Sequence, residues 1–185
     1  MNIIVKTFGS DLCHCRPDTT WERENRDFYS PECVNKVLWT PVVFARISKA
    51  GKCIGEKFAG RYYDSIGCGI LMYCEVDSNT GPAISACVDH TSILPMPLYD
   101  PMVLESDENF VVTRNSESIT TERSEWKDLL CKALCTASQL TSLRTGDYVA
   151  VEIAPQTTLA SREDGTAKVK GTFCEKEIFD FRIIF

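Results

Sequence analysis

Only one stretch of this chain has the periodicity of a long helix. From about residue 125 to 140, apolar side chains recur three or four positions apart, which is typical of a helix with one buried face. Ser124 precedes the stretch as its expected N-cap. The other apolar segments are short and separated by turn residues, so the core must be built mainly from strands. We therefore predict an α+β fold that is mainly β.

The expected strands are spread along the whole chain. A short helix is expected at 55–62, and the four prolines between 81 and 101 predict only brief regular structure there. Asp164-Gly165 predicts a hairpin turn. Residues 11–35 are polar and are predicted to form a loop-like insertion, either ordered or a mobile flap. The strands are expected at residues 1–5, 42–45, 70–74, 110–113, 118–120, 148–153 and 167–173.

Length and charge restrict the class of protein. A chain of 185 residues suits a single domain spanning 1–185. The net charge of −6 and the pI near 5.0 argue against nucleic acid and against anionic membrane surfaces, because both attract dense Lys and Arg. No signal peptide or membrane-spanning apolar run is recognisable, so a cytoplasmic location is expected.

The ten cysteines raise the alternative of a zinc-binding regulatory module. Cys13-His14-Cys15 with Cys33, or Cys131 with Cys135 on the predicted helix, would supply soft ligands. However, no repeated Cys-x-x-Cys pattern occurs, and neighbouring strand residues face opposite sides. Reduced, packed thiols are the simpler interpretation.

Three segments carry a resemblance to a known family. Residues 58–64 read Phe-Ala-Gly-Arg-Tyr-Tyr-Asp, residues 142–147 read Ser-Leu-Arg-Thr-Gly-Asp, and residues 170–181 form an expected closing hairpin. In these segments the chain resembles the fumarylacetoacetate hydrolase family, especially its short single-domain bacterial members. The resemblance is clearest over 51–70 and 111–185. It implies layered mixed sheets in a β-roll of the family's C-terminal-domain type, and a homodimer.

The resemblance also implies where a metal would bind. Family members hold Mg²⁺ or Mn²⁺ with a Glu-x-Glu pair on one strand and an Asp on the next. These positions fall on Thr40, Val42 and Leu71, and no Asp or Glu occurs between Cys33 and Gly55. An alternative alignment, anchored on residues 41–44, deletes the strand that carries the Glu-x-Glu pair, so the pair is missing in that alignment as well. Because hard cations need oxygen ligands, we expect the family's metal cofactor to be absent.

The other positions that the resemblance assigns to the pocket have changed too. The family's catalytic His falls on or beside Cys13, with His14 next to it, and its substrate-binding Lys falls near Ala86. Its Thr-Gly-Thr-Pro loop reads Val-Glu-Ile-Ala at 151–154. By family position the pocket would be lined by Leu71, Ala86, Asp89, Glu152 and Ile153.

Several polar residues have both a functional and a structural interpretation. His90 is a weak candidate for a general base oriented by Asp89, but a histidine in a proline-rich loop is more often surface. Glu75 and Asp77 would rebuild a partial carboxylate site with Asp64 if the register shifted, and are otherwise loop residues. Structural roles are expected for four residues: Arg61 and Asp64 as an ion pair, and Gly146 and Asp147 in a turn.

The leading hypothesis is a divergent member of this family without metal-dependent catalysis, whose scaffold binds a small carboxylate or a protein partner. The first alternative is a working hydrolase that cleaves a carbon–carbon bond in substrates of the acylpyruvate or fumarylpyruvate type. The second is the zinc-binding module. Chelator-sensitive turnover would distinguish the first alternative, and elemental analysis the second.

Overall fold

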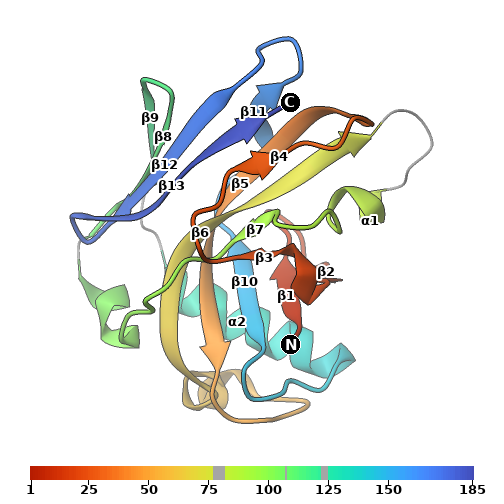
Figure 1. Ribbon diagram of the computed structural model, residues 1–185. Coiled ribbons are helices and arrows are strands. Elements are labelled where there is room, and N and C mark those ends of the chain that lie inside the picture. Colours follow the sequence, from red (N-terminus) through yellow and green to blue (C-terminus); the bar gives the residue numbers. More distant parts are fainter. Residues whose placement is uncertain (77–81, 107, 122–124) are drawn as a thin grey trace.

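The computed structural model describes residues 1–76, 82–106, 108–121 and 125–185 as two β-sheets and one long helix (Figure 1). The larger sheet runs in the order β2-β1-β10-β5-β6-β7-β3, with β11 paired to β5. The smaller runs in the order β4-β13-β12-β8-β9. The fold is mainly β with curled mixed sheets, as the sequence predicts.

The larger sheet is built on two long antiparallel strands, β5 (Val34–Ile47) and β6 (Tyr63–Val76). Their apolar runs are buried on both faces because the sheet is covered on both sides. The remaining strands of this sheet are β1 (Ile3–Lys6), β2 (Cys13–Arg16), β3 (Trp21–Glu22), β7 (Ser92–Ile93), β10 (Tyr148–Glu152) and β11 (Thr157–Ser161).

The chain path forces this sheet to curl. β2 and β3 lie at opposite edges but are joined only by Pro17 and the 3-10 helix η1 (Asp18–Thr20). Six strand spacings in a flat sheet would span about 29 Å, whereas five residue steps reach at most roughly 17 Å. The two edges must therefore approach each other, and the sheet closes into a roll. Thr20 Oγ1 and Ser92 Oγ, 2.8 Å apart, link η1 to β7.

The smaller sheet packs against the outer face of the roll, and the helix α2 (Trp126–Leu140) packs on the same face (Figure 1). These layers share the larger of two apolar cores. The second core fills the inside of the roll. The strands of the smaller sheet are β4 (Phe28–Tyr29), β8 (Phe110–Arg114), β9 (Glu117–Thr121), β12 (Ala167–Phe173) and β13 (Lys176–Ile184).

Most of the expected elements are present. The helix spans Trp126–Leu140, and β8 with β9 and β12 with β13 form the two expected hairpins. The proline-rich region holds only α1 (Pro82–Ser85), β7 and the 3-10 helix η3 (Pro101–Glu105). The expected N-cap Ser124 lies outside the described residues.

Three expectations need correction. The Asp164-Gly165 turn does not make a hairpin: it connects β11 in the roll to β12 in the other sheet, because β11 pairs with the distant β5 while β12 pairs with β13 and β8. The helix expected at 55–62 is a 3-10 helix, η2 (Glu56–Arg61). The insertion at 11–35 is not loop-like throughout, since it contains β2, η1, β3 and β4.

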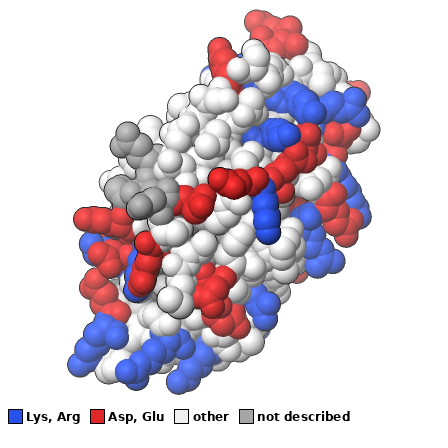
Figure 2. Space-filling model, turned by 90° about the vertical axis from the view of Figure 1, so that its left-hand side faces the viewer, with Lys and Arg blue, Asp and Glu red and all other residues white. Residues whose placement is uncertain are grey.

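Among the described residues, no helix combines the length and apolar character needed to cross a membrane. Figure 2 shows one face of the molecule, on which acidic side chains cross the middle and basic ones lie at the lower end and along the right-hand edge. No continuous basic stripe crosses this face.

Candidate functional site

The inside of the roll brings together polar side chains from strands that are distant in the sequence. Side chains alternate between the two faces of a strand, so His14 and Arg16 of β2 face the same way as Tyr73 of β6 and Glu152 of β10. Around them lies the inner core, formed by Ile3, Val5, Val42, Phe44, Leu71, Ala86, Leu94, Tyr148 and Ala150.

The three positions that the resemblance assigns to metal ligands lie on this inner face. Thr40 is directly opposite Leu71 in the β5–β6 ladder, and Val42 is two residues further along β5. All three have no solvent-exposed surface. Thr40 Oγ1 donates to the carbonyl of Ala154 at 2.6 Å, which ties its hydroxyl to the backbone. A hydroxyl and two hydrocarbon side chains do not fit a hard divalent cation.

Arg16 supplies the positive charge inside the roll. Its side chain is buried, with Nε donating to the carbonyl of Ala86 at 2.7 Å. Nη2 donates to the carbonyl of Met72 at 2.6 Å and to Thr91 Oγ1 at 2.9 Å. Nη1 is buried and has no hydrogen-bond partner. Burial lowers the pKa of Arg16, but a guanidinium remains protonated in proteins.

Tyr73 connects this charge to a buried carboxylate. The guanidinium carbon of Arg16 lies 4.9 Å from the centre of the Tyr73 ring, a cation–π arrangement. The Tyr73 hydroxyl donates to Glu152 Oε1 at 2.5 Å, and the backbone N–H of Phe8 donates to Oε2 at 2.9 Å. Burial is the main cause that raises the pKa of Tyr73, and Glu152 adds to it while Arg16 opposes it.

His14 completes the group. Its ring centre lies 6.3 Å from that of Tyr73, and its Nε2 is buried without a hydrogen-bond partner. Burial lowers the pKa of His14, and the Arg16 charge lowers it further, while Glu152 acts in the opposite direction. The neutral imidazole is therefore favoured.

The neighbouring thiols Cys13 and Cys15 line a small surface pocket with His14 but do not join it inside the roll. Cys13 packs with the outer core, on the opposite face of β2. Cys131, on α2, makes a hydrogen bond with Tyr63. Within the described ranges, no group of three or more His, Cys, Asp or Glu side chains is arranged to hold a metal ion.

The positions assigned to the family pocket are only partly brought together. Leu71 and Glu152 lie inside the roll, and Ala86 contributes its carbonyl to Arg16. Ile153 packs with the outer core instead. Asp89 is exposed and lines a surface cleft of about 620 Å³.

His90 lines the same cleft, but its partner is not the one expected. His90 Nδ1 lies 2.9 Å from Oε2 of Glu22, whose side chain is only 4% exposed. Glu22 Oε1 also accepts the backbone N–H of Glu24 at 2.6 Å. The pair holds β3 against the loop after α1, and Asp89 does not orient the ring. Sequence reasoning missed Glu22 because it lies in the polar insertion.

The residues with expected structural roles behave differently from one another. Asp147 accepts backbone N–H groups from Asn2 at 2.8 Å and Arg144 at 2.9 Å, and Gly146 has a φ of +90° in the same turn. The ion pair between Arg61 and Asp64 does not form.

Each member of the expected pair has another contact. Arg61 lies over the Phe58 ring, and Asp64 accepts from Ser65 Oγ.

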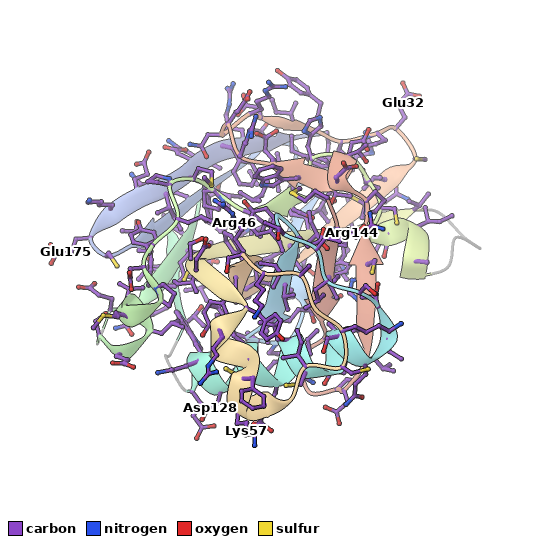
Figure 3. All side chains as sticks on the ribbon, turned by 90° about the horizontal axis from the view of Figure 1, so that it is seen from below. Glu32, Arg46, Lys57, Asp128, Arg144 and Glu175 are labelled. Atoms are coloured by element: carbon purple, nitrogen blue, oxygen red, sulfur yellow. The ribbon has the colours of Figure 1, made fainter. Side chains whose placement is uncertain are left out.

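The carboxylates that would have rebuilt a partial site do not converge. Glu75 lies 3.7 Å from Lys36 near one end of β6, and Asp64 is at the other end. Asp77 lies outside the described residues. Seen from below, Lys57 and Asp128 point outward from η2 and α2, so they take no part in the interior group (Figure 3).

Arg16 and Tyr73 are the interior residues that sequence reasoning missed. The segment 11–35 has too few apolar residues to indicate a buried strand, and Tyr73 sits in a run that reads as wholly apolar. A weak signal was available: on any strand, His14 and Arg16 must share a face.

Comparison with known proteins supports the fold. No family model and no curated protein matches the sequence. Among solved structures, fumarylpyruvate hydrolase from Pseudomonas aeruginosa in complex with Mn²⁺ and pyruvate matches with a TM-score of 0.78 at 13% identity, covering 100% of this chain and 90% of the other.

Two further structures agree with that match. A protein from Yersinia pestis CO92 assigned to the fumarylacetoacetate hydrolase family has a TM-score of 0.76 at 12% identity, over 99% of this chain and 92% of the other. Maleylpyruvate hydrolase from Sphingobium sp. SYK-6 in complex with manganese(II) and pyruvate has a TM-score of 0.75 at 14% identity, over 97% and 69%. The resemblance to this family in fold is therefore confirmed.

Proposed function

We propose that this chain keeps the fold of the fumarylacetoacetate hydrolase family without its metal-dependent catalysis, and that the scaffold binds a small carboxylate or a protein partner. One observation carries the proposal: Thr40, Val42 and Leu71 occupy the positions assigned to the metal ligands and are fully buried in the inner core.

The chemistry of metal-assisted cleavage explains why these residues matter. A bound divalent cation polarises a carbonyl group and stabilises the enolate that forms, which is worth several kcal/mol of transition-state stabilisation. Val42 and Leu71 have no lone pair to hold such a cation, and Thr40 already donates its hydroxyl proton to Ala154. The only buried cation described here is the guanidinium of Arg16, which cannot exchange oxygen ligands as a metal ion does.

The test is a measurement of Mn²⁺ binding together with turnover. Titration calorimetry should give no heat of Mn²⁺ binding at the site, and a fumarylpyruvate-type substrate should not be cleaved with or without chelator. An active fumarylpyruvate hydrolase assayed in parallel serves as the positive control. Stoichiometric Mn²⁺ binding with chelator-sensitive cleavage would refute the proposal.

The alternative of a working hydrolase draws support from the similar structures, of which two are hydrolases of fumarylpyruvate and maleylpyruvate. It requires ligands other than Thr40, Val42 and Leu71. The same assay separates the two functions, because only the alternative predicts turnover that stops when chelator is added.

Homodimerisation is part of the proposal and rests on the family resemblance, and a cytoplasmic location is proposed as well. A molecular mass of 20.8 kDa by light scattering, which is that of one chain, would contradict the proposed dimer. For the zinc-binding alternative, elemental analysis of the purified protein decides: well under one zinc per chain excludes it.

A further inference from the structure

One end of the molecule is rich in basic side chains. It is formed by the connection from β5 to β6 and by the loop between α2 and β10, which lie together at the lower end in Figure 1. These segments, residues 46–64 and 141–147, are called the basic end below. They contain six Lys and Arg but only three Asp and Glu, although the whole chain has a net charge of −6. The six are Arg46, Lys49, Lys52, Lys57, Arg61 and Arg144.

The basic end differs from the rest of the surface in its ion pairs. Within the described residues, none of its six Lys and Arg forms an ion pair, whereas nine Lys and Arg elsewhere do. Five of the six are exposed, and Arg46 is half-buried. Among the three acids, Asp147 is buried and accepts two backbone N–H groups, so only Glu56 and Asp64 are exposed. Clustered charges of one sign attract an oppositely charged partner.

The loop that carries four of these charges is held in place by backbone hydrogen bonds. The N–H of Ser48 donates to the carbonyl of Tyr62 at 2.9 Å, which closes the loop. Gly51 and Leu143 exchange two bonds of 3.1 and 2.9 Å, which join it to the loop before β10. The basic side chains are therefore presented on an ordered backbone, so binding requires little further ordering of the loop.

Two aromatic rings lie among the charges. Lys49 Nζ is 5.3 Å from the centre of the Tyr62 ring. Lys57 Nζ and the guanidinium carbon of Arg61 lie 4.9 and 5.4 Å from the centre of the Phe58 ring. Phe58 is 42% exposed, so the basic end offers an apolar contact next to two cations.

We propose that the basic end docks an acidic segment of a partner protein, whose Asp and Glu side chains pair with the exposed Lys and Arg while an apolar side chain packs on Phe58. This inference rests on the proposed function and specifies the chemistry of its protein partner. The surface is separate from the family pocket: Arg46 is paired with Tyr148 at the start of β10, whereas Glu152 is at the other end of that strand.

The distribution of charge favours a short segment over an extended polyanion. Acidic side chains cross the middle of the face in Figure 2, above the basic ones at its lower end. A nucleic acid or an anionic membrane extends beyond one end of the molecule and would meet these acidic side chains as well. Because charges are screened over about 8 Å at physiological salt, a short acidic segment confined to the basic end avoids most of this repulsion.

The test is a titration of the full-length protein into a short synthetic peptide of Glu and Leu residues, labelled with fluorescein and followed by fluorescence anisotropy. Saturable binding with a Kd below about 1 mM is expected. The affinity should fall several-fold between about 50 mM and 200 mM salt, because salt screens exposed charge pairs.

Charge reversal locates the binding surface. Lys49→Glu combined with Lys57→Glu should weaken peptide binding at least about tenfold. Lys168→Glu combined with Lys176→Glu makes the same change in net charge on the smaller sheet and should change the affinity less than about twofold. All four lysines are exposed, so the variants should fold, and circular dichroism checks this.

A second pair of measurements tests the apolar contact. Replacing the Leu residues of the peptide with Ser should weaken its binding to the wild-type protein and have less effect on its binding to Phe58→Ala. Equal losses in the two proteins would overturn the contact with Phe58.

Two other anionic probes decide the class of partner: phosphatidylserine vesicles and a single-stranded oligonucleotide. If either binds more tightly than the peptide, and Lys49→Glu with Lys57→Glu removes that binding, the assignment to a protein segment is overturned. Absence of peptide binding, or equal weakening in the two double variants, overturns the docking surface itself.

The result can be separated from the outcome of the metal assay. If the peptide does not bind and Mn²⁺-dependent cleavage is also absent, the docking surface fails while the proposed loss of catalysis stands. If Mn²⁺ supports cleavage, the proposed function fails whether or not the peptide binds.

Discussion

Tyr73 is the residue on which the charged groups inside the roll depend. Its ring faces Arg16 and its hydroxyl donates to Glu152, so one side chain contacts both a buried cation and a buried anion. The surrounding side chains are mostly hydrocarbon, so the local dielectric constant is low. A low dielectric constant strengthens electrostatic interactions and makes an unpaired polar atom costly.

Replacing Tyr73 with Phe should therefore destabilise the protein. The variant keeps the ring beneath Arg16 but leaves Glu152 Oε1 without its donor, so the free energy of unfolding should fall by about 1–3 kcal/mol. Urea denaturation followed by circular dichroism measures this. Tyr29→Phe is the matched control, because Tyr29 is 71% exposed and should change stability by less than about 0.5 kcal/mol. Equal effects of the two variants would contradict the role of the hydroxyl.

Burial of Tyr63 makes stability sensitive to alkaline pH. Burial, together with Cys131, raises the pKa of Tyr63 to about 12, above its ordinary value of 10.0. Between these values the unfolded chain releases the phenol proton while the folded chain keeps it, so ionisation favours unfolding. This contribution to stability is fully present below pH 10 and is lost as the pH rises to 12.

We therefore expect the urea midpoint to fall above pH 10, and to fall less steeply in Tyr63→Phe. The comparison is made between variants at each pH because Cys74, whose pKa burial raises to about 12, contributes in the same direction in both proteins. Parallel curves for the two proteins would show that Tyr63 does not cause the effect.

At the scale of single elements, β6 shows how a central strand accommodates close neighbours. A Cβ at Gly69 would come within 2.2 Å of the backbone oxygen of Ile93 in β7, and one at Gly67 within 2.4 Å of the Phe44 ring. Glycine is thus required where a neighbouring backbone or ring approaches the strand.

Gly69→Ala should consequently disrupt the pairing of β6 with β7 and lower the thermal midpoint by several degrees, since backbone cannot move aside as a flexible side chain can. Gly60→Ala is the control, because nothing lies within 4 Å of its added Cβ. Scanning calorimetry of both variants gives the comparison, and similar midpoints would contradict the close approach.

Elements with local signals could be predicted from the sequence, whereas those defined by distant partners could not. The helix at Trp126–Leu140 and the hairpin of β8 and β9 depend on residues that are near in the sequence. The Asp164-Gly165 turn was recognisable as a turn, but its strands join different sheets. β11 pairs with β5, which lies too far along the chain for a local pattern to indicate.

At the scale of the whole molecule, the resemblance predicted the roll and located its interior, but not what fills it. Leu71 and Glu152 were expected in the pocket from the family positions. Arg16 was not, because it comes from a polar segment where the resemblance is loose, and only the folded roll brings it against Tyr73.

The larger sheet belongs to both cores, so we expect the roll and the smaller sheet to unfold together. Trp21 packs against the inner core and Trp126 lies in the outer core. Variants that keep one of these tryptophans, with the others replaced by Phe, should show coincident urea transitions by fluorescence. Separate midpoints would show that the two parts are independent domains.

The four-residue connection from Pro17 to Thr20 affects how readily the sheet edges of this protein could pair with other molecules. It is a covalent connection, and it holds the two edge strands of the larger sheet, β2 and β3, close together. A single proteolytic cut there would loosen both rims of the cylinder at once and offer their unpaired amides to other molecules. We therefore expect an intact connection at 17–20 to limit strand exchange and fibre growth.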